Sequence, residues 1–122
     1  MKMHDDGYRI VLEHKAEDLR QSLRHRGRIA AERAPEELEE TLLAAMRESE
    51  TRELERTSRL LRQVEAALAR LRAGNYGSCV RCELAIPEKR LRALPWAMYC
   101  VDCQELVDHL HAQVNALRMP AA

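Results

Sequence analysis

Four cysteines carry the clearest chemistry in this sequence. They form two pairs with two residues between the members of each, and 17 residues separate the pairs. The pairs are Cys79 with Cys82, and Cys100 with Cys103. Two such pairs supply the tetrahedral thiolate set that zinc prefers, with no coordination position left for a reactive water. We therefore expect one structural Zn²⁺, while two disulfides or redox-active thiols remain as alternatives.

The segment around these pairs needs the metal in order to fold. Residues 76–103 contain few large apolar side chains. Zinc binding in small modules contributes apparent free energies of roughly 10–16 kcal/mol. The sequence predicts a C4 zinc finger over residues 76–104, with short strands at 90–94 and 98–100 around a Pro95–Trp96 turn.

Glycines and prolines divide the rest of the chain into helical segments. Neither occurs in residues 8–26 or in residues 36–73. Pro35 suits a first helical position, and Gly74 followed by Asn75 is a typical helix stop. We expect helices at about 8–30 and 36–73, joined by a turn at about 27–35. Within residues 1–75, these form an antiparallel hairpin.

Apolar spacing indicates how this hairpin packs. The C-terminal half of the second helix, which we call its lower half, has a heptad pattern. It is formed by Leu54, Thr57, Leu61, Val64, Leu68 and Leu71. A turn near residue 31 places residue 8 beside residue 54, so the first helix would cover only the upper half. A C-terminal helix is expected over residues 101–118. Its part beyond the finger, residues 104–118, would cover the lower half. Its apolar face consists of Val107, Leu110, Val114 and Leu117.

The predicted fold is therefore mainly α. It is an antiparallel coiled-coil helical hairpin on a small C4 zinc-finger base, with a C-terminal helix packed on the base of the coil. More than half of the 122 residues are Ala, Glu, Lys, Leu or Arg, which is typical of long helices. The absence of Phe and the single Trp argue against a large globular core.

Charge and hydropathy exclude several classes of function. Lys plus Arg and Asp plus Glu are both 20, whereas a chain that coats nucleic acid is strongly basic. No apolar run is long enough to span a membrane, and the polar start of the chain differs from a signal peptide. We expect a cytoplasmic protein that is not an enzyme, since no set of catalytic residues can be recognised.

The residues of the finger resemble those of the DksA/TraR C4 zinc-finger family. The resemblance covers residues 74–95, the run 99–103 and the helical stretch 63–71 that leads into the finger. It implies a bacterial transcription regulator that binds RNA polymerase without contacting DNA. The hairpin of such a regulator enters the secondary channel of the polymerase and places an acidic tip near the active centre.

The tip of this chain departs from the Asp-x-x-Asp-x-Ala motif of the best-studied members. The three motif positions fall on Glu36, Glu39 and Thr41, so each carboxylate is one methylene longer and the alanine is lost. We identify Glu36 and Glu39 as candidate partner-binding residues. The alternative is that these acids only stabilise the start of the helix.

Arginines along the second helix are further candidates for partner binding. Arg52 and Arg56 could contact an acidic protein surface, or could belong to a solvated face of ion pairs. Three positions at which responsive members carry basic residues for ppGpp are uncharged here: Gln63, Leu94 and Gln104. The resemblance therefore implies little response to ppGpp.

Two other functions stay open at this point. The chain could be a zinc-stapled coiled-coil scaffold that keeps the fold and binds a different protein. Nucleic-acid binding through the finger is disfavoured by Glu83, Glu88 and Asp102 near the cysteines and by sparse aromatic residues. We expect a monomer.

Overall fold

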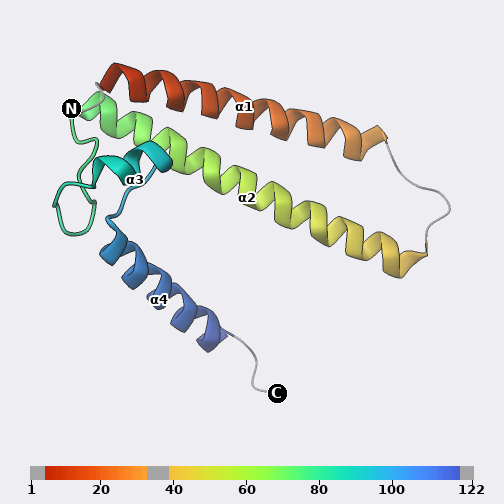
Figure 1. Cartoon of the computed structure of the whole chain (residues 1–122). Helices are drawn as coiled ribbons and strands as arrows, with labels where there is room; N and C mark the ends of the chain where they lie inside the picture. The colour runs from red at the N-terminus through yellow and green to blue at the C-terminus, as the bar shows by residue number, and fades with distance from the viewer. Residues whose placement is uncertain (1–4, 33–38, 119–122) are drawn as a thin grey trace.

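A computed structural model of the chain describes residues 5–32 and 39–118. It contains four helices: α1 (Asp5–Glu32), α2 (Glu40–Ala73), α3 (Glu88–Ala93) and α4 (Val101–Arg118). The mainly α fold is confirmed, with α1 and α2 lying antiparallel as a long hairpin above the cysteine-containing base (Figure 1). None of the described helices is both long and apolar enough to cross a membrane.

The hairpin is held together near its base by one apolar cluster. α1 contributes side chains at helical spacing and α2 contributes residues of the predicted heptad and their neighbours. The fully or almost fully buried members are Leu12, Ala16, Leu19, Val64, Ala67 and Leu68. Thr57 is also buried, and its hydroxyl donates to the carbonyl of Glu53 at 2.9 Å. The predicted heptad of α2 is therefore the face that meets α1.

The pairing between the two helices differs from the prediction. The ring of Tyr8 lies 5.1 Å from that of Tyr76, and Arg26 pairs with Glu53 at 3.3 Å. Residue 8 thus lies near the lower end of α2, more than 20 residues from the predicted partner at 54. The prediction that α1 covers only the upper half of α2 is wrong, because α1 packs on the lower half.

The reason is the position of the turn. The turn was expected near residue 31, but α1 continues through Gly27 to Glu32 and α2 begins only at Glu40. A single glycine inside a helix costs only about 1 kcal/mol, which neighbouring helical residues offset. When the turn of a hairpin moves by one residue along the chain, the residue that faces a given position changes by two. A displaced turn therefore has a large effect on which side chains meet.

The C-terminal helix does not pack on the coil. Among the residues described, close backbone packing between helices is confined to α1 and α2, and α4 points away from the hairpin (Figure 1). Three of the four apolar residues predicted to cover α2 are exposed: Leu110, Val114 and Leu117. The predicted docking of α4 is wrong because α1 already occupies the lower half of α2.

The predicted strand at 90–94 is also wrong. Residues 90–93 belong to α3, which begins after Pro87 and is made of strong helix formers, and Leu94 is its C-cap residue. The segment 98–100 is irregular, and its Met98 carbonyl accepts a hydrogen bond from the Val80 N–H at 2.8 Å. The predicted helix stop is confirmed: Gly74 has φ +79° and closes α2 in the left-handed conformation.

We expect the Leu12→Ala variant to lose about 2–5 kcal/mol of unfolding free energy, because Leu12 is fully buried between α1 and α2. Leu42→Ala is the matched control, since Leu42 lies on α2 with its side chain half exposed. It should change stability by about 0.5 kcal/mol or less. Urea unfolding of the zinc-loaded proteins, followed by circular dichroism, measures both. Equal losses in the two variants would contradict the observed pairing.

Candidate metal centre

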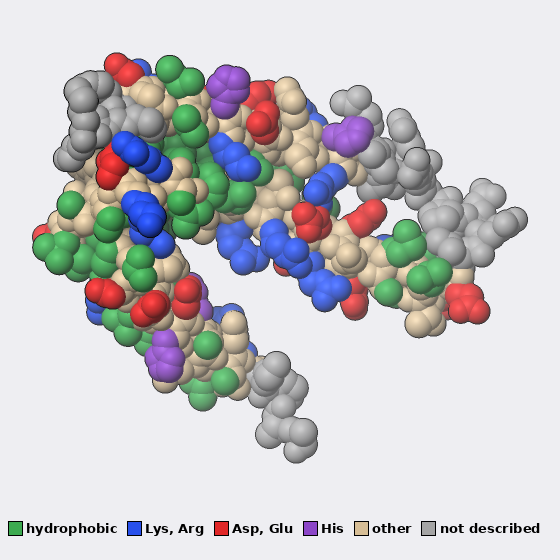
Figure 2. Space-filling view, viewed as in Figure 1, with side chains coloured by type: hydrophobic (Ala, Val, Ile, Leu, Met, Phe, Trp, Pro, Cys, Tyr) green, Lys and Arg blue, Asp and Glu red, His purple; other side chains and the backbone are tan. Residues whose placement is uncertain are grey.

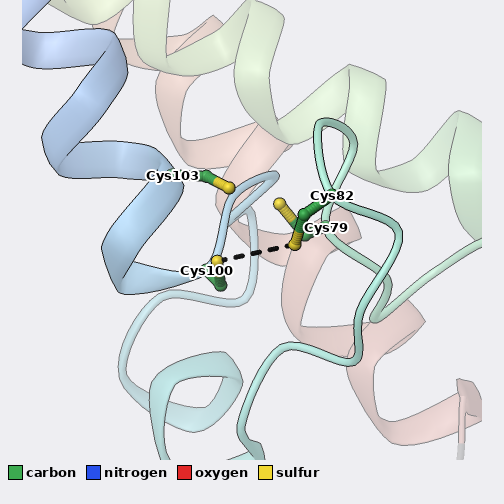
Figure 3. A group of neighbouring side chains, drawn as sticks. All are labelled: Cys79, Cys82, Cys100 and Cys103. Atoms are coloured by element: carbon green, nitrogen blue, oxygen red, sulfur yellow. Dashed lines mark hydrogen bonds between the residues drawn. The ribbon is translucent and has the colours of Figure 1, made fainter.

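The four cysteine sulfurs converge in the base of the molecule. All four Sγ atoms lie within 4.8 Å of one another, and those of Cys82 and Cys100 are 3.8 Å apart (Figure 3). Zinc–sulfur bonds of about 2.3 Å in a tetrahedron place sulfurs about 3.8 Å apart. The arrangement therefore fits zinc, and the predicted convergence of Cys79, Cys82, Cys100 and Cys103 is confirmed. A structural zinc is held here, with no open coordination position.

Local backbone bonds shape the first cysteine pair, residues 79–82, which we call the first knuckle. The Cys79 N–H donates to the Leu84 carbonyl at 2.8 Å, and the Glu83 N–H donates to the Cys79 carbonyl at 2.9 Å. A bridge between Ser78 and Ala85 closes this tight hairpin. The turn forces Glu83 into the left-handed region at φ +65°, which is uncommon for a residue with a Cβ.

Backbone donors also prepare the first knuckle for a metal ion. Burial alone would raise the pKa of Cys79, but the backbone N–H groups of Cys82, Cys100 and Arg81 lower this pKa to about 6. Cys103 behaves differently, because burial and the Cys100 side chain raise its pKa. Zinc binds thiolates, so the metal must displace the thiol proton at Cys103.

The second knuckle, residues 100–103, leads directly into α4. Cys100 precedes the helix and Cys103 lies in its first turn. The Gln104 N–H donates to the Cys100 carbonyl at 2.9 Å, which extends the helical bonding back to the knuckle. The metal centre therefore also fixes the start of α4.

The metal centre is packed directly against the hairpin. Tyr8 of α1 is buried in a cluster with Cys79, Ile86, Leu91 and Cys103. Its hydroxyl donates to a carboxylate oxygen of Glu88 in α3 at 2.7 Å. Burial and then Glu88 raise the pKa of Tyr8 to about 12, so the phenol stays protonated as a donor. The first helix is thus anchored on the finger at its N-terminal end.

The single tryptophan makes a second link between the finger and the hairpin. Trp96 packs against the apolar cluster of the hairpin, and Lys15 Nζ lies 5.7 Å from the centre of its ring. The Tyr76 hydroxyl donates to the Pro95 carbonyl at 2.7 Å, next to Trp96. These contacts hold the finger and hairpin together at one end.

The predicted tip residues lie at the opposite end of the hairpin. Glu36 lies outside the described residues. Glu39 occupies the N-cap position of α2, is exposed and makes no side-chain capping bond. The structure therefore places Glu39 far from the cysteine cluster along α2.

The predicted coil arginines both project from α2. Arg52 lines a shallow hollow with Thr51 and Glu55. Arg56 pairs with Glu53 at 3.3 Å, and the same carboxylate pairs with Arg26 of α1. Arg52 forms no ion pair within 4.0 Å among the described residues. Lys and Arg side chains gather along the edge of α2 that faces α4 (Figure 2).

Three residues of the site were not identified from sequence. The contact of Tyr8 with Glu88 joins residues 80 apart, and no periodicity indicates it. Arg81 donates to the Cys103 sulfur at 3.9 Å across 22 residues. The positive φ of Glu83 was missed because the residue that usually adopts this conformation, glycine, does not occupy this position.

We expect Glu83→Gly to stabilise the zinc-loaded protein by about 1 kcal/mol, because glycine removes the left-handed penalty at φ +65°. The matched control is Glu83→Gln, which removes the same charge but keeps the Cβ. Thermal unfolding at saturating zinc compares them. A stabilisation by Gln equal to that by Gly would show that charge, not backbone strain, is responsible.

Removing zinc with a chelator under reducing conditions should shift the fluorescence of Trp96 to the red. Trp96 belongs to the finger and packs against the apolar cluster of the hairpin, and this contact loosens when the finger loses its stabilising metal. Most of the helical circular dichroism should remain, because the cluster around Leu12 and Val64 contains no cysteine. Added zinc should restore the spectrum. Complete loss of helix would show instead that the hairpin depends on the metal.

Known proteins share both the finger and the overall fold. Residues 74–109 match the prokaryotic dksA/traR C4-type zinc finger. An uncharacterized protein of Aquifex aeolicus is 48% identical over 48 residues, which are 39% of this chain and 33% of the relative. The RNA polymerase-binding transcription factor DksA of Haemophilus influenzae is 34% identical over 84 residues, 69% of this chain and 53% of that protein. The matches thus span a third to about half of these relatives.

Solved structures agree with these matches. Transcription factor DksA2 of Pseudomonas aeruginosa superposes with a TM-score of 0.73 at 25% identity, over 88% of this chain and 85% of that one. The DnaK suppressor protein of Agrobacterium tumefaciens C58 gives a TM-score of 0.59 at 28% identity, over 87% and 96% of the two chains. Residues 74–109 of this chain therefore form a dksA/traR C4-type zinc finger, and the helical hairpin resembles that of solved DksA-like structures.

Proposed function

We propose that this protein is a transcription regulator that binds RNA polymerase through the secondary channel and modulates initiation. The observation that carries the proposal is the exposed carboxylate of Glu39 at the distal end of the hairpin, where α1 ends and α2 begins. The relative in Haemophilus influenzae is named as an RNA polymerase-binding transcription factor, which supports the same partner for this chain.

The dimensions of the hairpin suit entry into a narrow channel. α2 has 34 residues and is therefore about 50 Å long. Two paired helices are narrow, whereas the base adds the finger and α4 at one end only (Figure 1). The distal end can enter a channel while the base stays outside it.

The chemistry of the distal end supports a role for its acids. The Glu39 side chain does not cap the helix that follows it, so capping does not account for the carboxylate. A carboxylate presented there can interact with a metal ion or with basic groups of the partner. Glu36, which lies outside the described residues, is the second acid that we propose for this role.

The arginines of α2 supply a second contact surface in this proposal. Arg52 and Arg56 are both exposed, and a guanidinium can bind carboxylates of a partner through two parallel hydrogen bonds. Arg56 would exchange its intrahelical partner Glu53 for the polymerase. Such an exchange costs little, because exposed ion pairs are worth about 0–1 kcal/mol.

The proposed regulator acts in the cytoplasm as a monomer, has no catalytic activity and does not bind DNA directly. It depends little on ppGpp, since the three relevant positions are uncharged. Leu94 and Gln63 are exposed, and the Gln104 side chain donates to Asp108 at 2.9 Å. A highly charged nucleotide requires several cations, which these side chains do not provide.

We expect Glu39→Gln to bind bacterial RNA polymerase normally but to lose most of its effect on open-complex lifetime. The change removes one charge and keeps the shape of the side chain. Glu50→Gln is the matched control, because Glu50 is also exposed on α2 but lies about 16 Å along the helix. Displacement of a known secondary-channel factor measures binding, and promoter-complex decay measures the effect.

Two results would contradict the proposal. The folded, zinc-loaded protein could fail to displace the competing factor at any concentration, which would favour the scaffold function with a different partner. Glu39→Gln could also retain the full effect on open complexes. In that case the channel would be the binding site, but the acid would have no regulatory role.

A further inference from the structure

We propose that Arg81 balances the charge of the zinc centre and protects Cys103, thereby slowing release of the metal. The guanidinium of Arg81 donates to Cys103 Sγ with a nitrogen–sulfur distance of 3.9 Å. Arg81 belongs to the first knuckle and Cys103 to the second. One side chain therefore connects the two halves of the ligand set.

The backbone of Arg81 acts on the same centre. Its N–H is one of the donors that favour the thiolate of Cys79, so the residue contacts a ligand of each knuckle. Hydrogen bonds to metal-bound sulfur withdraw electron density and hold the ligand in place. A substitution that keeps the backbone bond and removes only the guanidinium separates the two contributions.

The charge of the centre shows why a cation matters. Zinc with four thiolates has a net charge of −2, and burying an uncompensated charge is unfavourable. Acids adjoin the knuckles at Glu83 and Asp102, which increases the negative charge. Among the described residues, no other Lys or Arg side chain donates to a cysteine sulfur. Arg81 therefore offsets one of the two negative charges of the zinc–thiolate group.

Release of the Cys103 sulfur from zinc would disturb several parts of the base. Cys103 is buried in the cluster that includes Tyr8, Ile86 and Leu91, and lies in the first turn of α4. Release of Cys103 from zinc frees the start of α4 and exposes the finger side of Tyr8. We infer that Arg81 lowers the nucleophilicity of this thiolate and so preserves the base of the hairpin.

The test follows zinc transfer from the full-length loaded protein to a chromogenic chelator in the presence of iodoacetamide. The thiolate sulfur attacks the methylene carbon, a sulfur–carbon bond forms and iodide leaves. The alkylated sulfur no longer binds zinc as a thiolate, so the chelator takes the metal. Mass spectrometry of samples taken early identifies the first cysteine to react.

Three variants separate the charge of Arg81 from other effects. Arg81→Gln removes the charge, Arg81→Lys keeps it, and Lys89→Gln removes a different exposed cation of the finger. We expect Arg81→Gln to release zinc about 10-fold faster, with Cys103 alkylated first. Arg81→Lys should lie between Arg81→Gln and the wild type, and Lys89→Gln should match the wild type.

Several outcomes would overturn the proposal. These are wild-type release by folded Arg81→Gln, faster release with another cysteine alkylated first, or equal acceleration by Lys89→Gln. If Arg81→Gln does not retain zinc after purification, Arg81→Lys decides the matter. Release close to the wild-type rate then supports charge balancing, whereas loss of zinc from the lysine variant as well overturns it.

Discussion

The closure of two knuckles around one ion is the constraint on which the base of this molecule depends. The finger has one isolated backbone bridge, one short helix and few buried side chains. These contacts alone are weak for a segment of this length, because ordering each residue costs about 1–2 kcal/mol in backbone entropy. The metal supplies the missing free energy and brings together residues separated by 17 positions in sequence.

The hairpin contacts this metal-bound base at one end. Tyr8 is buried among residues of the finger, and its hydroxyl bonds to Glu88. This contact fixes the position of α1 along its axis, since α1 can slide along α2 only by breaking it. With α1 in this position, Leu12 of α1 packs in the same apolar cluster as Val64 of α2. Tyr8 thus links the position of α1 to that of the finger.

Features that depend on local geometry could be predicted from the sequence. The spacing of the cysteines identifies the metal centre because a two-residue spacer fixes the approach of both sulfurs. Gly74 identifies the end of α2 because only a left-handed residue closes a helix in this way. Likewise, the heptad through Val64 identifies the buried face of α2, since the periodicity belongs to one helix.

Features that depend on distant parts of the chain could not be predicted. The turn of the hairpin was expected near residue 31, yet α1 extends through Gly27 to Glu32 and α2 begins only at Glu40. That choice depends on the burial gained when Leu12 reaches Val64, which exceeds the local cost of one glycine. The error then left the lower half of α2 without a partner, so α4 was assigned to it. Arg81 was missed for a related reason, because its target sulfur lies on the other knuckle.

The separation between the two ends of the hairpin has a physical consequence for its function. The distal end lies about 50 Å from the metal along α2, so it gains no direct stability from zinc. Leu42 and Met46 remain half exposed there, and few buried contacts hold this end. Such a segment can adapt to a partner at low cost, because little native packing must be broken. A rigid base with a weakly packed far end therefore suits a protein that docks through one region and acts through the other.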